Sequence, residues 1–169
     1  MTAGLRPTEP LDYVQNDDET TWLQPLEEQA WQGFLSLNRV VFAELEAQLQ
    51  SGSRMPLAHY AILVTLSDAP DRTLRMGELA RALYAAPSSI SHAMTRLESK
   101  GLIERRNDPK DRRAQFAVLT DAGAEALAAA APGHVGAVRR NLIDLLTADQ
   151  LAQLKEISDA VVNKVRPPR

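Results

Sequence analysis

The chain has 169 residues, of which 44% are hydrophobic and 24% charged, and its formal net charge is −3. These values are typical of one globular domain that is large enough to bury a core. The absence of cysteine excludes disulfides, thiolate metal sites and thiol-based redox sensing. No apolar run approaches the length of a membrane span, and residues 1–10 lack the apolar core of a signal peptide, so we expect a cytoplasmic protein with no membrane partner.

The charge is distributed unevenly along the chain. Residues 1–50 carry two bases against nine acids, a net charge of −7, whereas residues 96–113 carry seven bases against four acids, a net charge of +3. A protein that binds nucleic acid needs a basic surface only where it meets the phosphates. The overall acidity therefore does not exclude a nucleic-acid partner.

The first elements in chain order are an acidic arm and two helices. Residues 1–21 contain prolines at positions 7 and 10 and the run Asp17-Asp18-Glu19, and they predict a flexible arm. Between residues 26 and 50, apolar residues recur at three- and four-residue steps, which predicts a long amphipathic helix that ends at Ser51-Gly52-Ser53. A second helix is predicted over residues 57–67.

A helix-turn-helix pair follows these helices. Residues 73–75 can form a short strand, and residues 77–83 a short helix. Pro87 suits the first position of the next helix, in which Ile90, Met94 and Leu97 recur on one face and predict its buried side. The start and the opposite face of that helix form the candidate DNA-contact set, which is Pro87, Ser88, Ser89, Ser91, His92, Thr95 and Arg96. Short hydroxyls, an imidazole and a guanidinium suit base edges and phosphates at close range. A serine-rich helix start is by itself more typical of a cap, so the DNA hypothesis depends on the basic segment that follows.

That basic segment predicts a β-hairpin. We expect one strand at residues 103–106, a tip at residues 107–113, where Asn107-Asp108-Pro109 supplies turn chemistry, and a return strand at residues 114–119. A recognition helix joined to a charged hairpin is typical of a winged helix-turn-helix, in which the helix enters the major groove of DNA. The alternative is a solvated basic hairpin with no partner.

Helices are also predicted for the C-terminal part of the chain. Thr120 is a candidate cap for an alanine-rich helix, and Pro132-Gly133 predicts a kink or a break before a further helical segment at residues 135–146. A capping box from Thr147 to Gln150 starts the last helix. Its apolar stripe consists of Leu151, Leu154, Ile157, Val161, Val162 and Val165. Composition alone does not decide whether this stripe packs within the chain or against a second copy.

Several segments, in this order, resemble MarR-type bacterial transcriptional regulators. They are Gly77-Glu78-Leu79-Ala80, Leu97-Glu98-Ser99-Lys100-Gly101-Leu102-Ile103, Asp108-Pro109-Lys110-Asp111-Arg112-Arg113 and Val118-Leu119-Thr120-Asp121-Ala122-Gly123, together with the apolar helix from Leu57 to Leu66. The resemblance implies a mainly α fold with a small β-hairpin wing. It places a winged helix-turn-helix lobe at residues 57–119 and a helical dimerisation lobe at residues 22–56 and 120–169, preceded by the acidic arm.

The resemblance also implies a function and further site residues. It indicates a homodimeric transcriptional regulator that binds a palindromic operator in double-stranded DNA, acting as a repressor that a small aromatic or phenolic effector releases. In the wing, the candidates for DNA contact are Lys110 and a tip arginine, Arg112 or Arg113, with Asp111 bracing Arg113. The candidate effector residues are Trp31, Arg39, His59 and Tyr60, and each has an alternative role in packing or at the surface. Family members often carry arginine where this chain has His92, so the strength and the pH dependence of that contact are left open.

Enzymatic readings have little support in the sequence. The chain lacks the motifs of a nucleophile elbow, a dinucleotide or P-loop phosphate site and a His-Glu-x-x-His metal helix, and its three histidines are far apart. We therefore expect no catalytic residue, no metal and no cofactor. Two alternatives stay open: a dimeric winged-helix interaction module that does not bind DNA, and an enzyme built on a helical dimer.

Overall fold

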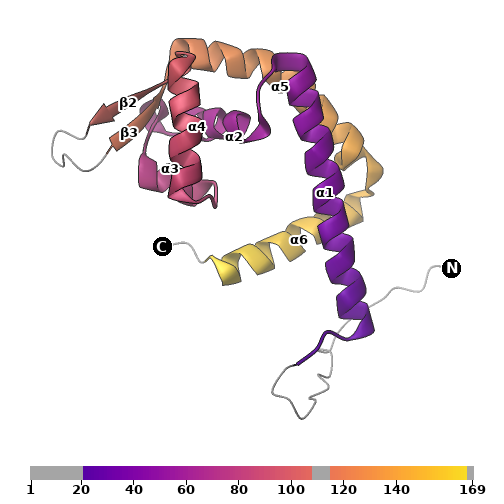
Figure 1. Cartoon of the computed structure of the whole chain (residues 1–169). Helices are drawn as coiled ribbons and strands as arrows, with labels where there is room; N and C mark the ends of the chain where they lie inside the picture. Colours follow the sequence, from indigo (N-terminus) through magenta and orange to yellow (C-terminus); the bar gives the residue numbers. More distant parts are fainter. Residues whose placement is uncertain (1–20, 108–114, 167–169) are drawn as a thin grey trace. The chain divides into compact units, whose positions relative to one another are not determined.

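A computed structural model describes residues 21–107 and 115–166 of the chain (Figure 1). The chain divides into two units, residues 1–40 and 41–169. The elements in chain order are α1 (Pro25–Ser53), α2 (Leu57–Ser67), a 3-10 turn (Pro70–Arg72), β1 (Thr73–Arg75), α3 (Met76–Ala82), α4 (Pro87–Ser99), β2 (Ile103–Asn107), β3 (Gln115–Leu119), α5 (Asp121–Asn141), a second 3-10 turn (Ile143–Leu145) and α6 (Ala148–Val165). The expected mainly α fold with a small hairpin wing is confirmed.

Helix α1 begins in the first unit and continues into the second. It ends at Ser53, within the predicted terminal segment Ser51-Gly52-Ser53. The hydroxyls of Ser51 and Ser53 donate to the backbone oxygens of Gln48 and Leu49 at 3.0 and 2.9 Å. In the first unit the rings of Trp31 and Phe34 stack with their centroids 6.0 Å apart, and both side chains are exposed.

Helix α2 lies at the centre of the second unit. Its Ile62, Leu63 and Leu66 are fully buried, and it packs against α3, α4, α5 and strand β3. An almost continuously apolar helix of this kind needs neighbours on every side, which the helix-turn-helix and α5 supply. The second unit thus has its main core around α2.

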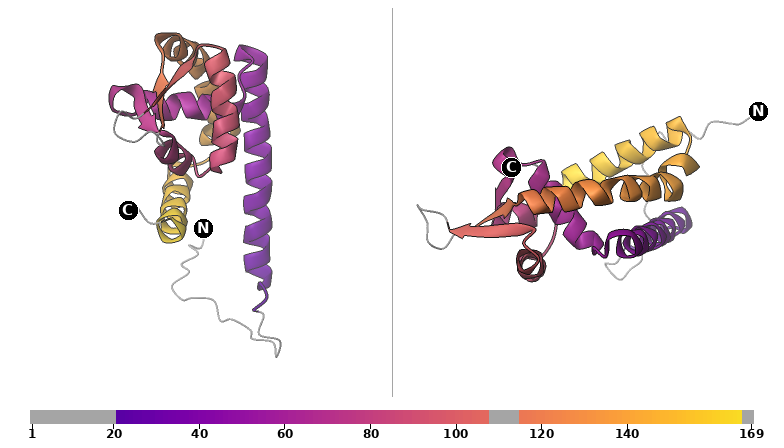
Figure 2. Two further views of the ribbon diagram at one scale, coloured as in Figure 1. Left: turned by 60° about the vertical axis from the view of Figure 1, so that its left-hand side comes forward. Right: turned by 90° about the horizontal axis from the view of Figure 1, so that it is seen from above.

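The three strands form one antiparallel sheet in the order β1-β3-β2. Thr73 pairs with Val118 across β1 and β3, while Ile103 pairs with Leu119 and Arg105 with Ala117 across β2 and β3. The right-hand view of Figure 2 shows the β2–β3 hairpin projecting from the helices of its unit. The predicted hairpin is confirmed in its two arms, and its tip lies outside the described residues.

Helix α4 has the predicted start and the predicted buried side. Pro87 occupies its first turn, and Ile90, Met94 and Leu97 are buried. The helix ends in a Schellman motif, because the amide of Leu102 donates to Leu97 O at 3.0 Å and Gly101 adopts a left-handed φ of 68°. This turn directs the chain from α4 straight into β2.

The start of α5 is bonded to the same turn. Thr120 caps α5 as predicted, since its hydroxyl oxygen accepts from the amide of Gly123 at 3.0 Å. The Thr120 hydroxyl also donates to Gly101 O at 2.7 Å, and the Thr120 amide donates to Leu102 O at 3.2 Å. The end of α4, the start of β2 and the start of α5 therefore meet at one hydrogen-bonded corner.

Of the kink or break predicted at Pro132-Gly133, the break is wrong and the bend is present. Helix α5 is continuous from Asp121 to Asn141 with Pro132 inside it, and Figure 1 shows the helix bending along its length. A proline removes one helical hydrogen bond and tends to kink the helix, while packing of Ala130 and Ala137 holds both halves in place. The segment predicted to stay helical to residue 146 instead ends at Asn141 and continues as a 3-10 turn.

Helix α6 begins with the predicted capping box. The amide of Gln150 donates to Thr147 Oγ1 at 3.2 Å, and the amide of Thr147 donates to Gln150 Oε1 at 2.9 Å. No residue of α6 is buried in the single chain. Within residues 21–107 and 115–166, none of the helices has the length and apolar composition that crossing a membrane requires.

Candidate nucleic-acid interface

The polar face of α4 is open to solvent. Every member of the predicted contact set on this helix is exposed: Pro87, Ser88, Ser89, Ser91, His92, Thr95 and Arg96. The buried side of α4 fixes this orientation, because Ile90, Met94 and Leu97 anchor the helix in the core. The helix therefore presents hydroxyls, an imidazole and a guanidinium on one accessible surface.

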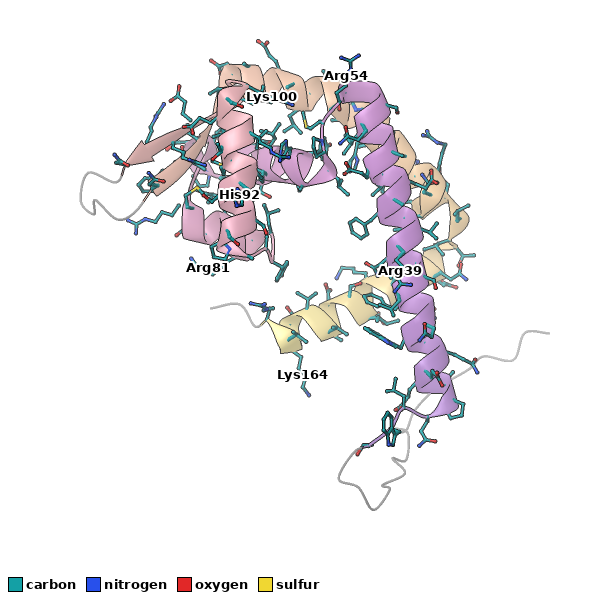
Figure 3. All side chains as sticks on the ribbon, in the orientation of Figure 1. Arg39, Arg54, Arg81, His92, Lys100 and Lys164 are labelled. Atoms are coloured by element: carbon teal, nitrogen blue, oxygen red, sulfur yellow. The ribbon has the colours of Figure 1, made fainter. Side chains whose placement is uncertain are left out.

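Cations surround this face in the part of the chain that the structure describes. Figure 3 shows His92 on α4 between Arg81 of the neighbouring helix α3 and Lys100, which follows the end of α4. All three side chains are exposed. This arrangement suits a ligand with a negatively charged backbone.

The wing contributes two arginines in its described arm, and they point to opposite sides of the strand. Arg106 is exposed and its Nη2 lies 2.9 Å from Glu104 Oε2, on the same strand. Arg105 turns the other way and reaches α4, where its Nη2 lies 2.9 Å from Thr95 Oγ1. The predicted wing residues Lys110, Asp111, Arg112 and Arg113 lie outside the described residues.

Arg105 was not among the predicted site residues, although the sequence held a signal for it. Side chains alternate along a strand, so a residue two positions after the apolar Ile103 lies on the same face. Ile103 is buried, and Arg105 therefore faces the body of the unit, where the recognition helix lies. Because residues 96–113 are basic overall, composition alone did not separate Arg105, which faces α4, from Arg106, which is exposed.

The four candidate effector residues lie in two different units. Trp31 and Arg39 belong to the first unit and are exposed (Figure 3 labels Arg39). His59 and Tyr60 lie on α2 in the second unit and are buried, with the Tyr60 ring 4.3 Å from the ring of His134 on α5. The ring contact favours the packing role for Tyr60, and burial favours it for His59.

His59 and His134 are buried histidines whose charged forms are disfavoured. Burial is the main cause that lowers the pKa of His59, and the positive charges of Lys100 and Arg96 lower it further, against an opposing effect of Glu46. Burial also lowers the pKa of His134. The Nδ1 atoms of both rings are buried without a hydrogen-bond partner among the described residues.

These pKa shifts predict a stability that falls in mild acid. Because the unfolded chain binds protons at an ordinary histidine pKa of about 6.5 and the folded chain does so only at lower pH, the free energy of unfolding should fall as the pH drops below about 6.5. The slope is limited to about 1.4 kcal/mol per pH unit for each histidine. Urea unfolding between pH 7 and 5 measures the slope of the free energy of unfolding against pH. The double variant His59→Gln, His134→Gln should have a smaller slope. An equally steep slope in that double variant would contradict the assignment.

The described residues offer no centre for metal chemistry. Among residues 21–107 and 115–166, no group of three or more histidine, aspartate or glutamate side chains is arranged to hold an ion. The features that are present are an exposed polar helix face, cations around it, and a hairpin bonded to that helix. Together with the helix-turn-helix they define a winged helix-turn-helix protein.

Comparison with known proteins identifies the family. The family model described as the MarR family matches residues 55–115. The structure resembles Sco3205, a MarR family transcriptional regulator from Streptomyces coelicolor solved in complex with DNA, at 41% identity and a TM-score of 0.84, covering 89% of this chain and 94% of that one. It also resembles AbsC, a MarR family transcriptional regulator from the same organism, at 38% identity and a TM-score of 0.81, covering 88% and 100% of the two chains.

A curated relative gives the same result over a shorter stretch. The transcriptional regulator HosA of Escherichia coli O111:H- is 33% identical over 73 residues, which are 43% of this chain. The chain spans about half of the length of that relative, 53%. The chain belongs to the MarR family. Since these relatives are transcriptional regulators, the enzyme alternative is set aside.

Proposed function

We propose that the protein is a sequence-specific DNA-binding regulator that represses transcription by occupying a palindromic operator as a homodimer. The observation that carries this proposal is the exposed polar face of α4, held outward by its buried side and flanked by cations and a hairpin. Helices of this kind read base edges in the major groove, and cations beside them bind phosphates. The likeness to Sco3205, which was solved with DNA, supports the same assignment.

The direct test is selection of bound duplexes from a random DNA pool, followed by a salt titration of the best duplex. We expect a palindrome whose half-sites lie about one helical turn, ~10 bp, apart, because two recognition helices related by a twofold axis enter successive major grooves. The logarithm of the affinity should fall steeply with the logarithm of the salt concentration as counterions are released. No enrichment at any salt concentration would favour the alternative, a dimeric winged-helix interaction module without DNA binding.

The wing tip provides a prediction of its own. Arg113→Ala should weaken binding to the selected duplex by more than about 1 kcal/mol, since an arginine in a narrow minor groove reads its negative potential. Fluorescence anisotropy at matched salt measures the effect. Arg140→Ala, which removes an exposed arginine of α5, controls for the loss of one positive charge. Equal affinities of the Arg113 variant and the unsubstituted protein would remove Arg113 from the interface.

The apolar side of α6 supports the homodimer. Ile157 and Val161 are 63% and 57% exposed in the single chain, and Val162 and Val165 are exposed as well. A contiguous apolar stripe of this kind is typical of an interface, and a twofold dimer would cover both copies at once. Pairing would also supply the second recognition helix that a palindrome requires.

Release by a small aromatic or phenolic effector is the regulatory part of the proposal. In the first unit, the stacked pair Trp31 and Phe34 offers an aromatic surface and Arg39 offers a cation. Benzoates and phenols are first screened for release of the selected duplex from the unsubstituted protein. The compounds that release it are expected not to release the duplex from the Arg39→Ala variant. Arg54→Ala, which removes an exposed cation following α1, is the matched control. Equal release from the two arginine variants would contradict the role of Arg39.

A further inference from the structure

The contact between the wing and the recognition helix depends on one arginine. Arg105 lies in the middle of β2 and pairs with Ala117 of β3. Its Nη2 donates to the backbone oxygen of Ser91 and to Thr95 Oγ1, both at 2.9 Å. One side chain of the wing thus holds two successive turns of α4.

The same residue is also bonded to the last turn of α4. The backbone amide of Arg105 donates to Glu98 Oε1 at 3.2 Å, and the Arg105 Nη1 lies 3.6 Å from Glu98 Oε2. The Arg105 side chain is 23% exposed, and its Nε is buried with no hydrogen-bond partner in the part of the chain that the structure describes. The Arg105 guanidinium therefore lies between β2 and α4 and is mostly shielded from solvent.

The contact with Arg105 also limits the hydrogen bonds that the Thr95 hydroxyl can make. Its hydroxyl donates its only hydrogen to Ser91 O at 3.1 Å while it accepts from Arg105. A threonine hydroxyl has one hydrogen and two lone pairs, so Thr95 retains one lone pair for an outside group. Toward DNA it can accept a hydrogen bond, from cytosine N4 or adenine N6, and it cannot donate one.

We propose that Arg105 is a positioning residue that fixes the wing against the recognition helix and occupies one of the two lone pairs of Thr95 Oγ1, so that a single acceptor position of this hydroxyl is left for base recognition. The acceptor role rests on the proposed function, whereas the bond between wing and helix does not. Planar guanidinium groups suit this task because they donate in fixed directions to several acceptors at once.

The geometric part of the proposal can be tested without DNA. Because the chain contains no cysteine, nitroxide labels can be placed only where Ser88→Cys and Asn107→Cys introduce thiols, one on α4 and one on β2. Labelled protein is diluted with unlabelled protein so that the measured spin–spin distances arise within one chain. We expect a narrow distance distribution in the otherwise unsubstituted protein and a clearly broader one in Arg105→Met.

Arg106→Met is the matched control for this measurement. It removes the same charge from the next residue of the same strand, but the Arg106 side chain is 64% exposed and pairs with Glu104 of its own strand. Its distance distribution should stay narrow. Arg105→Lys, which keeps the charge and the aliphatic stem, should give intermediate broadening and replaces Arg105→Met if that variant does not fold. Equal widths in the Arg105 and Arg106 variants would overturn the proposal.

The recognition part is tested by repeating the duplex selection with each variant. Arg105→Met should bind the duplex selected by the unsubstituted protein about tenfold more weakly than Arg106→Met at matched salt. It should also select a changed base at one position of each half-site, because Thr95 Oγ1 then offers the bases two lone pairs in place of one and no guanidinium fixes its position. A protein that is merely less stable would return the original sequence with lower affinity.

The outcomes separate this inference from the proposed function. If no duplex is enriched by the unsubstituted protein, the proposed function fails, while the distance distributions still decide whether Arg105 holds the wing. If a duplex is enriched and Arg105→Met returns the same bases, the influence of Arg105 on base recognition by Thr95 is overturned.

Discussion

Alanine in place of Gly123 is expected to lower the free energy of unfolding by at least about 2 kcal/mol, because the added methyl has no space. Gly123 lies in the first turn of α5, where a Cβ atom would approach Leu102 O to 2.0 Å and Leu119 Cδ1 to 2.7 Å. The Leu102 oxygen cannot easily move away, since it accepts from the Thr120 amide and lies between α4 and β2. The strain would therefore pass to the corner that joins the recognition helix to the wing.

Urea unfolding followed by circular dichroism measures this loss. Gly77→Ala is the matched control, because Gly77 also lies in a helix and a Cβ atom there would meet nothing within 4 Å. Alanine is the better helix former by about 1 kcal/mol, so the control should be as stable as the unsubstituted protein or more stable. If the two alanine variants unfold at the same urea concentration, the close approach at Gly123 is wrong.

If the protein is the proposed dimer, Val161→Asp is expected to convert it to a monomer and to weaken binding to the selected duplex about 100-fold or more. The substitution places a charge at the centre of the exposed stripe on α6, where an interface would bury it without a partner. A monomer offers one recognition helix, so the gain in affinity from two linked half-site contacts is lost. Sedimentation velocity over a range of concentrations reports the mass, and anisotropy with the selected duplex reports the affinity.

The control for this prediction carries the same new charge on the other side of the helix. Asn163→Asp lies two residues further along α6, about 200° around the helix axis from Val161. It should leave both the mass and the DNA affinity unchanged. A Val161→Asp protein that remains dimeric would exclude this stripe as the interface.

Local patterns in the sequence were sufficient for the recognition helix. The steps of four and three between Ile90, Met94 and Leu97 predicted its buried side, and the structure buries all three residues. Caps were equally predictable at Thr120 and at Thr147, because the chemistry of a cap involves residues only three apart. These features follow from nearest neighbours along the helix.

Features that depend on distant partners could not be predicted in this way. The pairing of β1 with β3 joins Thr73 to Val118, and three residues of strand contain too little pattern to specify a partner. The sequence could not decide between a kink and a break at Pro132-Gly133, and the helix continues through Pro132 because the packing of α5 outweighs one missing hydrogen bond. The positive charge of Arg105 did not predict its role, because its partners Ser91 and Thr95 lie on a different element, helix α4.

The corner at which α4, β2 and α5 meet is expected to form early while the chain is being synthesised. Its hydrogen bonds all join residues between Leu97 and Gly123, whereas α6 begins only at Ala148. Contacts between residues close in sequence form quickly, and a nascent chain folds from its N-terminal part while synthesis continues. The recognition helix and wing can therefore be joined before the ribosome has finished the apolar stripe of α6. If the protein forms the proposed dimer, newly made copies would then pair with the recognition helix and wing already folded. An error in translation after α5 would leave this folded helix and wing without the α6 surface that the proposed dimer needs.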